Sequence, residues 1–214
     1  LLFCAVLGQL VLLVGVLHQD LLGLGWWIFL QQMLLQVLVV NSRLYLTIFA
    51  SNVCHAAVEF EDARGSLSAL KNAGIKISKL QLSSAMRIPS VGPDTVQQLG
   101  QMNEPVYMHQ VVENRGRTLI RYSDIPEALK EIDAAQGSEW RIHFHVPIFL
   151  EEMQTVATTQ QFLKDILAIH KEQPVTEQLE VETYTWDVLP ESYKSVGVSA
   201  AIARELAWVQ DQLS

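Results

Sequence analysis

The sequence predicts an α/β fold: a parallel sheet with helices packed outside it. After residue 50 the spacing of apolar residues alternates repeatedly between a period of 2 and a period of 3.6, which is typical of strands and helices in turn. Each of the four predicted strands is followed by a predicted helix. Strands joined through helices run parallel, so these units belong to one parallel sheet.

The helix boundaries have recognisable end signals. Gly74 closes the first helix, Ser123 or Asp124 caps the second, Pro126 suits its first turn and Gly137 its end. The elements expected are, in order, strand 43–56, helix 60–74, strand 76–85, helix 125–137, strand 140–150, helix 155–173, strand 179–189 and helix 199–213. Between strand 76–85 and helix 125–137, residues 103–124 hold two alternating runs around Asn114-Arg115-Gly116, which predict a β-hairpin insertion. We expect either a lid or dimer arm there, or a purely structural insertion.

Residues 1–50 differ in composition from the rest of the chain. Asp20 and Arg43 are their only acidic and basic side chains, so residues 51–214 carry the net charge of −8. Residues 1–17 and 21–40 approach the length of about 20 apolar residues that crosses a bilayer. Three interpretations stay open for this segment: membrane helices, a truncated signal peptide, or translation that is not native to the following domain. Because the chain starts at Leu1, we also expect a fragment, a processed product or an incomplete reading frame.

The charge balance and the cysteines limit the function classes. Clustered lysine and arginine, which a nucleic-acid surface needs, are absent from the sequence, so nucleic acid is not an expected partner. Cys4 and Cys54 form no disulfide framework. We therefore expect a cytoplasmic protein, or a membrane-associated one if residues 1–40 are native.

The predicted strands have one apolar and one ionisable face. Alternation places Ile142, Phe144 and Val146 opposite Arg141, His143 and His145. The same pattern separates Leu80 and Leu82 from Lys79, Gln81 and Ser83, and Leu179 and Val181 from Glu180, Glu182, Tyr184 and Trp186. If the apolar face meets the helices, the ionisable face lines an enclosed interior, where charges need partners or a cation.

A metal site at the rim of a barrel meets that requirement. His55, His143, His145 and Glu182 all fall near the ends of predicted strands, where barrel active sites are assembled. Zinc would suit the imidazoles, and manganese or magnesium would suit the carboxylates. The alternative is structural pairing, Glu180 with Lys79 and Arg141 with Glu182.

Five segments in this order resemble the EboE-like metabolite-traffic family of the xylose-isomerase-like barrels. They are NVCHAAVEFED (52–62), KLQLSSAMR (79–87), YMHQ (107–110), HFHVPIF (143–149) and EVETYTWDVLP (180–190). The resemblance covers about residues 52–214 and implies the C-terminal half of a (β/α)8 barrel, with about four βα units and the hairpin insertion. Residues 1–50 share nothing with the family.

The resemblance also implies roles for residues. The family's D-x-x-H motif maps onto Asn52 to His55, so an amide stands where the family has a metal-binding aspartate, and Glu182 matches the final-strand glutamate. We expect Asn52, His55, His143, His145 and Glu182 as metal ligands and Glu182 and His55 as catalytic groups. The expected substrate-binding residues are Gln81, Ser83, His109, Tyr184 and Trp186.

The family implies a metal-dependent isomerase or epimerase that acts on a small polar metabolite, using a divalent cation, Zn, Mn or Mg. A binding protein that assists metabolite transport without catalysis is the alternative, because Asn52 stands where the family has an aspartate and Gln81 where it has a histidine. A membrane-tethered module is the third hypothesis. Half a barrel exposes strand edges, so aggregation or pairing into a homodimer is expected.

Overall fold

The computed structural model describes residues 49–100, 102, 108–182, 186–189 and 191–214. The chain divides into two units, Leu1–Leu46 and Thr47–Ser214, and every described residue belongs to the second. The membrane segments expected at 1–17 and 21–40 lie outside the described residues. Within the described part, no helix has the length and apolar character needed to cross a membrane.

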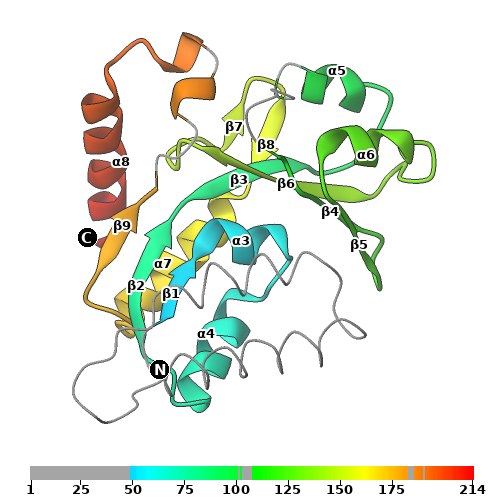
Figure 1. The fold of residues 1–214 in the computed structure, drawn as a ribbon. Coiled ribbons are helices and arrows are strands. Elements are labelled where there is room, and N and C mark those ends of the chain that lie inside the picture. Colours follow the sequence, from blue (N-terminus) through cyan, green and yellow to red (C-terminus); the bar gives the residue numbers. More distant parts are fainter. Residues whose placement is uncertain (1–48, 101, 103–107, 183–185, 190) are drawn as a thin grey trace, which may run out of the picture. The chain divides into compact units, whose positions relative to one another are not determined.

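The described unit is a mixed α/β structure with two sheets (Figure 1). The first sheet is parallel, with the strand order β1-β2-β9. Its strands are β1 (Phe49–Asn52), β2 (Ile77–Leu82) and β9 (Leu179–Val181). The predicted parallel sheet is therefore present, with three strands in the described residues.

Three long helices cover the apolar face of the parallel sheet. They are α4 (Ala63–Asn72), α7 (Gln160–Glu172) and α8 (Val198–Leu213). Leu80 and Leu82 of β2 are buried against them, in a core whose other members include Leu67 of α4, Leu163 of α7 and Val209 of α8. Since α4 precedes β2, α7 precedes β9 and α8 follows β9, the sheet and its helices form a succession of βα units.

The second sheet is antiparallel, with the order β5-β4-β6-β3-β8-β7. Its strands are β3 (Ser84–Ile88), β4 (Val111–Asn114), β5 (Leu119–Tyr122), β6 (Glu139–Val146), β7 (Glu152–Met153) and β8 (Val156–Thr158). Helices α5 (Thr95–Gly100) and α6 (Ile125–Lys130) pack on it through a second core that contains Trp140, Ile142 and Phe144. This whole sheet is inserted between β2 and α7.

The prediction that strand 140–150 joins the parallel sheet was wrong. β6 pairs antiparallel with β3 and with β4. The cause lies at Ser83, the single residue between β2 and β3, because the extended chain leaves the parallel sheet there and enters the second one. The alternating faces of β6 are typical of antiparallel strands, whereas a strand covered on both sides by helices is apolar throughout.

The hairpin within 103–124 is confirmed for β4 and β5. The Arg115 amide donates to the Thr118 carbonyl over 3.0 Å, and the Asn114 carboxamide oxygen accepts from the Gly116 amide over 2.7 Å. Gly116 has φ +84°, which suits glycine. Val112 of β4 is fully buried, so the hairpin is built into the sheet.

The predicted end signals are confirmed in part. Gly74 follows the end of α4 at φ +71°, and Asp124, not Ser123, caps α6. Helix α4 begins after its N-cap Asp62, later than residue 60, and α6 ends at Lys130, before Gly137, which stands at φ +79° at the end of the turns that follow. Helix 155–173 begins later than predicted because residues 156–158 form β8. The strand predicted at 179–189 stops at Val181 and gives way to the 3-10 turns η1 (Trp186–Val188) and η2 (Glu191–Tyr193).

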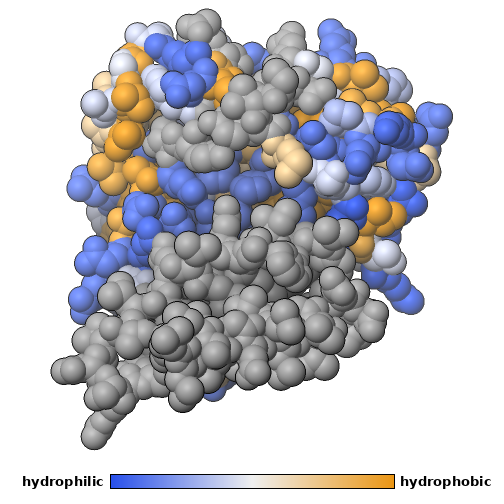
Figure 2. All heavy atoms as spheres, viewed as in Figure 1, coloured by the Kyte–Doolittle hydropathy of each residue, from blue (hydrophilic) through white to orange (hydrophobic). Residues whose placement is uncertain are grey.

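On the face drawn in Figure 2, hydrophilic side chains cover most of the described area, and hydrophobic ones form smaller separate groups. Three of the exposed large hydrophobic residues belong to α8 or directly precede it: Val196, Val198 and Leu206. Isolated exposed apolar residues of this kind are normal for a folded domain.

Candidate metal centre

The site is built where the strands of the parallel sheet end. Asn52 is the last residue of β1, and Ser83 and Glu182 directly follow β2 and β9. The Asn52 side-chain amide donates to Glu182 Oε2 over 2.7 Å, and the Ser83 hydroxyl donates to Asn52 Oδ1 over 3.3 Å. Carboxyl ends of parallel strands meet at one edge of a sheet, where α/β proteins commonly place ligands.

A short helix brings a thiol and an imidazole to this edge. Helix α3 (Val53–Val58) follows β1 directly, where the sequence predicted the end of a strand. Asn52 Oδ1 accepts hydrogen bonds from the amides of Cys54 and His55, over 3.0 and 3.3 Å. Asparagine is a favoured N-cap because its side chain satisfies such amides, so Asn52 itself turns the strand into a helix.

Strand β6 supplies two more imidazoles from the other sheet. Its core side carries Trp140, Ile142 and Phe144, and its opposite side carries His143 and His145. The His143 ring meets the His55 ring edge to face, with centroids 4.2 Å apart. His143 Nε2 lies 3.0 Å from His145 Nε2.

Cys54, His143 and His145 form a cluster that could hold a metal ion. One ligand atom from each of them lies within 4.8 Å of the others. Ions bound by cysteine and histidine have ligand distances of about 2.0–2.3 Å, which a modest closure of this cluster would give. Sulfur with two imidazole nitrogens is a donor set typical of zinc.

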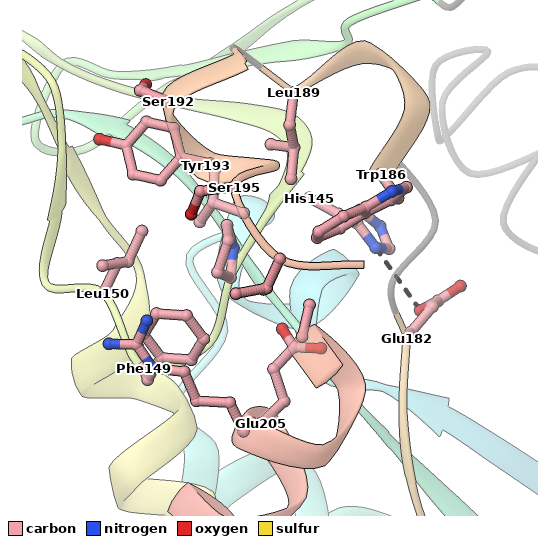
Figure 3. A pocket seen from close by; sticks show the side chains of 15 residues that line it. His145, Phe149, Leu150, Glu182, Trp186, Leu189, Ser192, Tyr193, Ser195 and Glu205 are labelled. Carbon is pink, nitrogen blue, oxygen red and sulfur yellow. Dashed lines mark ion pairs between the residues drawn. The ribbon is translucent and has the colours of Figure 1, made fainter. Parts of the chain in front are cut away.

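Glu182 is placed to orient one of these imidazoles. His145 Nδ1 lies 3.8 Å from Glu182 Oε2, while its Nε2 faces His143 (Figure 3). A histidine that binds a metal through one nitrogen commonly uses the other toward a carboxylate or carbonyl. Glu182 is therefore either an orienting group for His145 or an additional ligand.

Burial keeps the three imidazoles neutral. It lowers the pKa of His55 and of His145 to about 4, and lowers the pKa of His143 well below its usual value, with further lowering there from the neighbouring histidines. Neutral imidazoles offer the lone pairs that a metal needs. Because burial raises the pKa of the Cys54 thiol, metal binding would have to displace its proton.

Burial also acts on Glu182. It raises the pKa of this carboxyl, with a further increase from Glu180, against the lowering effect of the Asn52 hydrogen bond. A raised pKa makes the carboxylate of Glu182 a stronger base than that of an ordinary glutamate. This is the property expected of a general base or acid.

A pocket opens beside the cluster. Its volume is about 280 Å³, and His145, Glu182 and Trp186 form one end of it (Figure 3). Such a volume is at the lower end of the range of about 300–1,000 Å³ for ligand pockets, so a small molecule fits and a dinucleotide does not.

Of the residues expected as metal ligands, His143 and His145 lie together in the cluster with Cys54. His55 packs against His143, and Glu182 contacts both His145 and Asn52. Cys54 was missed because a lone thiol without a partner at ligand spacing gives no motif. Its position beside His55 is the only sequence signal for it.

Only some of the expected substrate-binding residues lie at the cluster or the pocket. Ser83 contacts Asn52, and Trp186 lines the pocket. Gln81 lies on β2 beside Asn52 of β1 and Glu180 of β9. His109 is 1% exposed and stacks on Phe144, with centroids 5.3 Å apart, and is not among the residues that line the pocket. Tyr184 lies outside the described residues.

Of the two structural salt bridges considered as alternatives, one is present. Lys79 Nζ lies 2.9 Å from Glu180 Oε2. Arg141, in contrast, binds Glu139 over 2.8 Å and the Ala57 carbonyl over 2.6 Å, so the alternative in which it pairs with Glu182 is not found. Glu182 is thus left to the histidine cluster and Asn52.

The amide at position 52 can be tested by Asn52→Asp. Aspartate keeps the acceptor that caps α3 but replaces the donor to Glu182 by a second carboxylate. We expect the metal-free variant to lose about 1–3 kcal/mol of unfolding free energy at pH 7. The loss should shrink on acidification, when one carboxyl takes up a proton, and also on zinc addition. Urea unfolding at several pH values, with and without zinc, measures both effects.

The control is Asn114→Asp, because the Asn114 side chain also accepts from a turn amide, that of Gly116. Aspartate there keeps the acceptor and lies away from the cluster. If both variants lose the same stability, the Asn52 contact with Glu182 has no special importance.

Comparisons of the chain with protein-family models, with curated proteins and with solved structures return no match.

Proposed function

We propose that this protein binds a divalent transition-metal ion through Cys54, His143 and His145, and uses this centre to convert a small polar metabolite. The observation that carries the proposal is the convergence of these three ligands within 4.8 Å at the carboxyl ends of the parallel strands. Zinc is the ion best suited to one sulfur and two imidazole donors. The reaction class is isomerisation or epimerisation, as the resemblance to the EboE-like barrels implies.

The family assignment is part of this proposal. In the described residues β1, β2 and β9 are parallel neighbours in chain order, with α7 and α8 following β2 and β9. Successive βα units of a barrel have this arrangement. We infer a partial xylose-isomerase-like barrel in which residues 84–158 are an inserted antiparallel sheet, larger than the hairpin insertion that the sequence suggested.

The residues divide the chemistry as follows. A bound zinc ion would act as a Lewis acid toward a carbonyl or hydroxyl oxygen. Glu182, with its raised pKa, would remove a proton from the carbon next to that oxygen and return it. Asn52 holds the Glu182 carboxylate in position through its 2.7 Å hydrogen bond. His55 is neutral at pH 7 and packs against His143, where it can complete the ligand set, while its pKa of about 4 makes it a weak base at that pH.

A non-catalytic metabolite carrier is the second candidate. The contact that favours it is the bond from Asn52 to Glu182, because a carboxylate that already accepts a hydrogen bond is a weaker base. In this role the metal and the pocket bind the metabolite without turnover. The buried free thiol of Cys54 supports a reducing compartment such as the cytoplasm for either role.

The two roles differ in carbon–hydrogen exchange. Zinc-loaded protein is incubated in heavy water with a set of small aldoses, ketoses and hydroxy acids, and proton NMR follows deuterium entry at the carbon next to the carbonyl. We expect exchange that disappears after chelation and falls at least about 100-fold in Glu182→Gln. Glu180→Gln is the matched control, because Glu180 lies on β9, two residues before Glu182, and pairs with Lys79 outside the cluster. Since Glu180 contributes to the raised pKa of Glu182, we expect this variant to change the exchange rate only slightly.

Metabolite binding without exchange would assign the carrier role. Exchange that is unaffected by chelation would contradict the proposed metal chemistry.

A further inference from the structure

The pocket beside the cluster has its own chemistry at the end away from His145. Arg204 of α8 lines this end, and its guanidinium lies over the Phe149 ring, 3.8 Å from the centroid. Stacking of this kind holds the guanidinium plane while its N–H groups stay available at the edges. Within the described residues, no carboxylate forms an ion pair with Arg204.

The two acids that line the pocket are held by protein donors. Glu205 is 3% exposed and accepts from the Ile148 amide over 3.1 Å, and Glu182 accepts from Asn52. The hydroxyl groups that line the pocket can instead donate hydrogen bonds to a ligand. The Tyr193 oxygen accepts from the Gln154 amide over 2.9 Å, which leaves its own proton to donate, and Ser192 and Ser195 add two further hydroxyls.

The remaining wall is apolar. Leu150 lies on the side of Phe149 and Tyr193, Trp186 lies against His145 at the other end, and Leu189 lines the wall as well (Figure 3). A ligand that fills the pocket therefore meets a cation, hydroxyl donors and a leucine at one end, and an indole beside the histidine cluster at the other end.

We propose that this pocket binds a small organic anion, whose carboxylate or phosphate group is held by Arg204 and whose apolar body lies against Leu150, Trp186 and Leu189. The inference rests on the proposed function only for the orientation, in which the reacting oxygen points to the metal ligands. It narrows the substrate from any polar metabolite to an anionic one with an apolar part. Bidentate bonding of arginine to carboxylate or phosphate supplies the specificity.

Isothermal titration with three probes of similar size tests the proposal: phenylacetate, phenyl phosphate and neutral 2-phenylethanol. We expect at least one anion to bind about ten-fold or more tightly than the alcohol, and the tighter of the two identifies the anionic group. Inorganic phosphate alone should bind weakly, because it lacks the apolar body.

Three arginine variants locate the anion. Arg204→Gln should weaken anion binding about ten-fold or more and leave 2-phenylethanol unchanged, and Arg204→Lys should have a smaller effect because it keeps the charge without the planar fork. Arg117→Gln removes the same charge at the exposed β4–β5 turn and should have no effect. Circular dichroism melting checks that each variant is folded.

All titrations are repeated after chelation, so that the two proposals can fail separately. Anion binding that needs Arg204 in metal-free protein supports the inference even if zinc never binds. Three outcomes would overturn the inference: anion and alcohol bind equally, neither anion binds detectably, or Arg204→Gln keeps full affinity for the anion. If zinc is still taken up in these cases, the metal centre is left intact.

Discussion

His143→Ala is expected to lower the zinc affinity of the protein about 100-fold or more. The change removes one of three ligand atoms that lie within 4.8 Å of one another, and each ligand of a protein zinc site contributes a large share of the binding free energy. Cys54→Ser should have an effect of similar size, because a hydroxyl is a poor substitute for thiolate. Competition with a chromophoric chelator gives the affinities, and metal analysis after dialysis gives the stoichiometry.

Cobalt substitution identifies the sulfur ligand. Cobalt-loaded wild type should show thiolate charge-transfer absorption that Cys54→Ser lacks. His170→Ala is the matched control, since His170 lies on α7 and its Nδ1 accepts from the Val175 amide, away from the cluster. Zinc affinity unchanged in both His143→Ala and Cys54→Ser would remove the metal centre.

Metal-free protein is expected to lose stability steeply as the pH falls from about 6.5 to about 4. Burial lowers the pKa of His145 to about 4, so in this interval the unfolded chain binds a proton that the folded chain refuses. The stability that comes from the lowered histidine pKa is therefore fully present at pH values above the ordinary pKa of about 6.5, and it is lost as the pH falls to the pKa of the folded state. For His145, which is 5% exposed, the full effect is about 3 kcal/mol.

His55 adds to the same loss, because its pKa is also lowered to about 4. Urea unfolding of chelated protein between pH 4 and 7 measures the slope. His145→Gln, which cannot titrate, should reduce the slope, and His170→Gln should reduce it less because burial lowers the His170 pKa only moderately. Equal slopes in wild type and His145→Gln would mean that the His145 imidazole is not held neutral by the fold.

Local signals predicted the helices better than the sheets. The end of α4 before Gly74 and the start of α6 after Asp124 were predicted, because capping depends on a few neighbouring residues, whereas α6 ends at Lys130 and not at Gly137. Helix α3 was missed although Asn52 is a good N-cap, since the apolar run before it suggested a strand that continued.

The partners of a strand depend on distant residues. The alternation in β6 was recognised, and it correctly separated His143 and His145 from the core side chains. It did not show that β6 pairs with β3 and β4, because pairing is decided by the extended path through Ser83. The same limit hid Cys54, whose relation to His143 and His145 exists only once the two sheets are together.

Ser83 has a consequence for how the centre is completed. A single residue separates β2 from β3, so the chain passes directly from one sheet into the other. The metal-binding groups come from both sides of this junction: Cys54 from the helix that follows β1, and the two imidazoles from β6. An ion bound there would join one sheet to the other across this junction. The ion would then stabilise the association of the two sheets and not the fold of either sheet alone. Its affinity would depend on how closely the two sheets pack against each other.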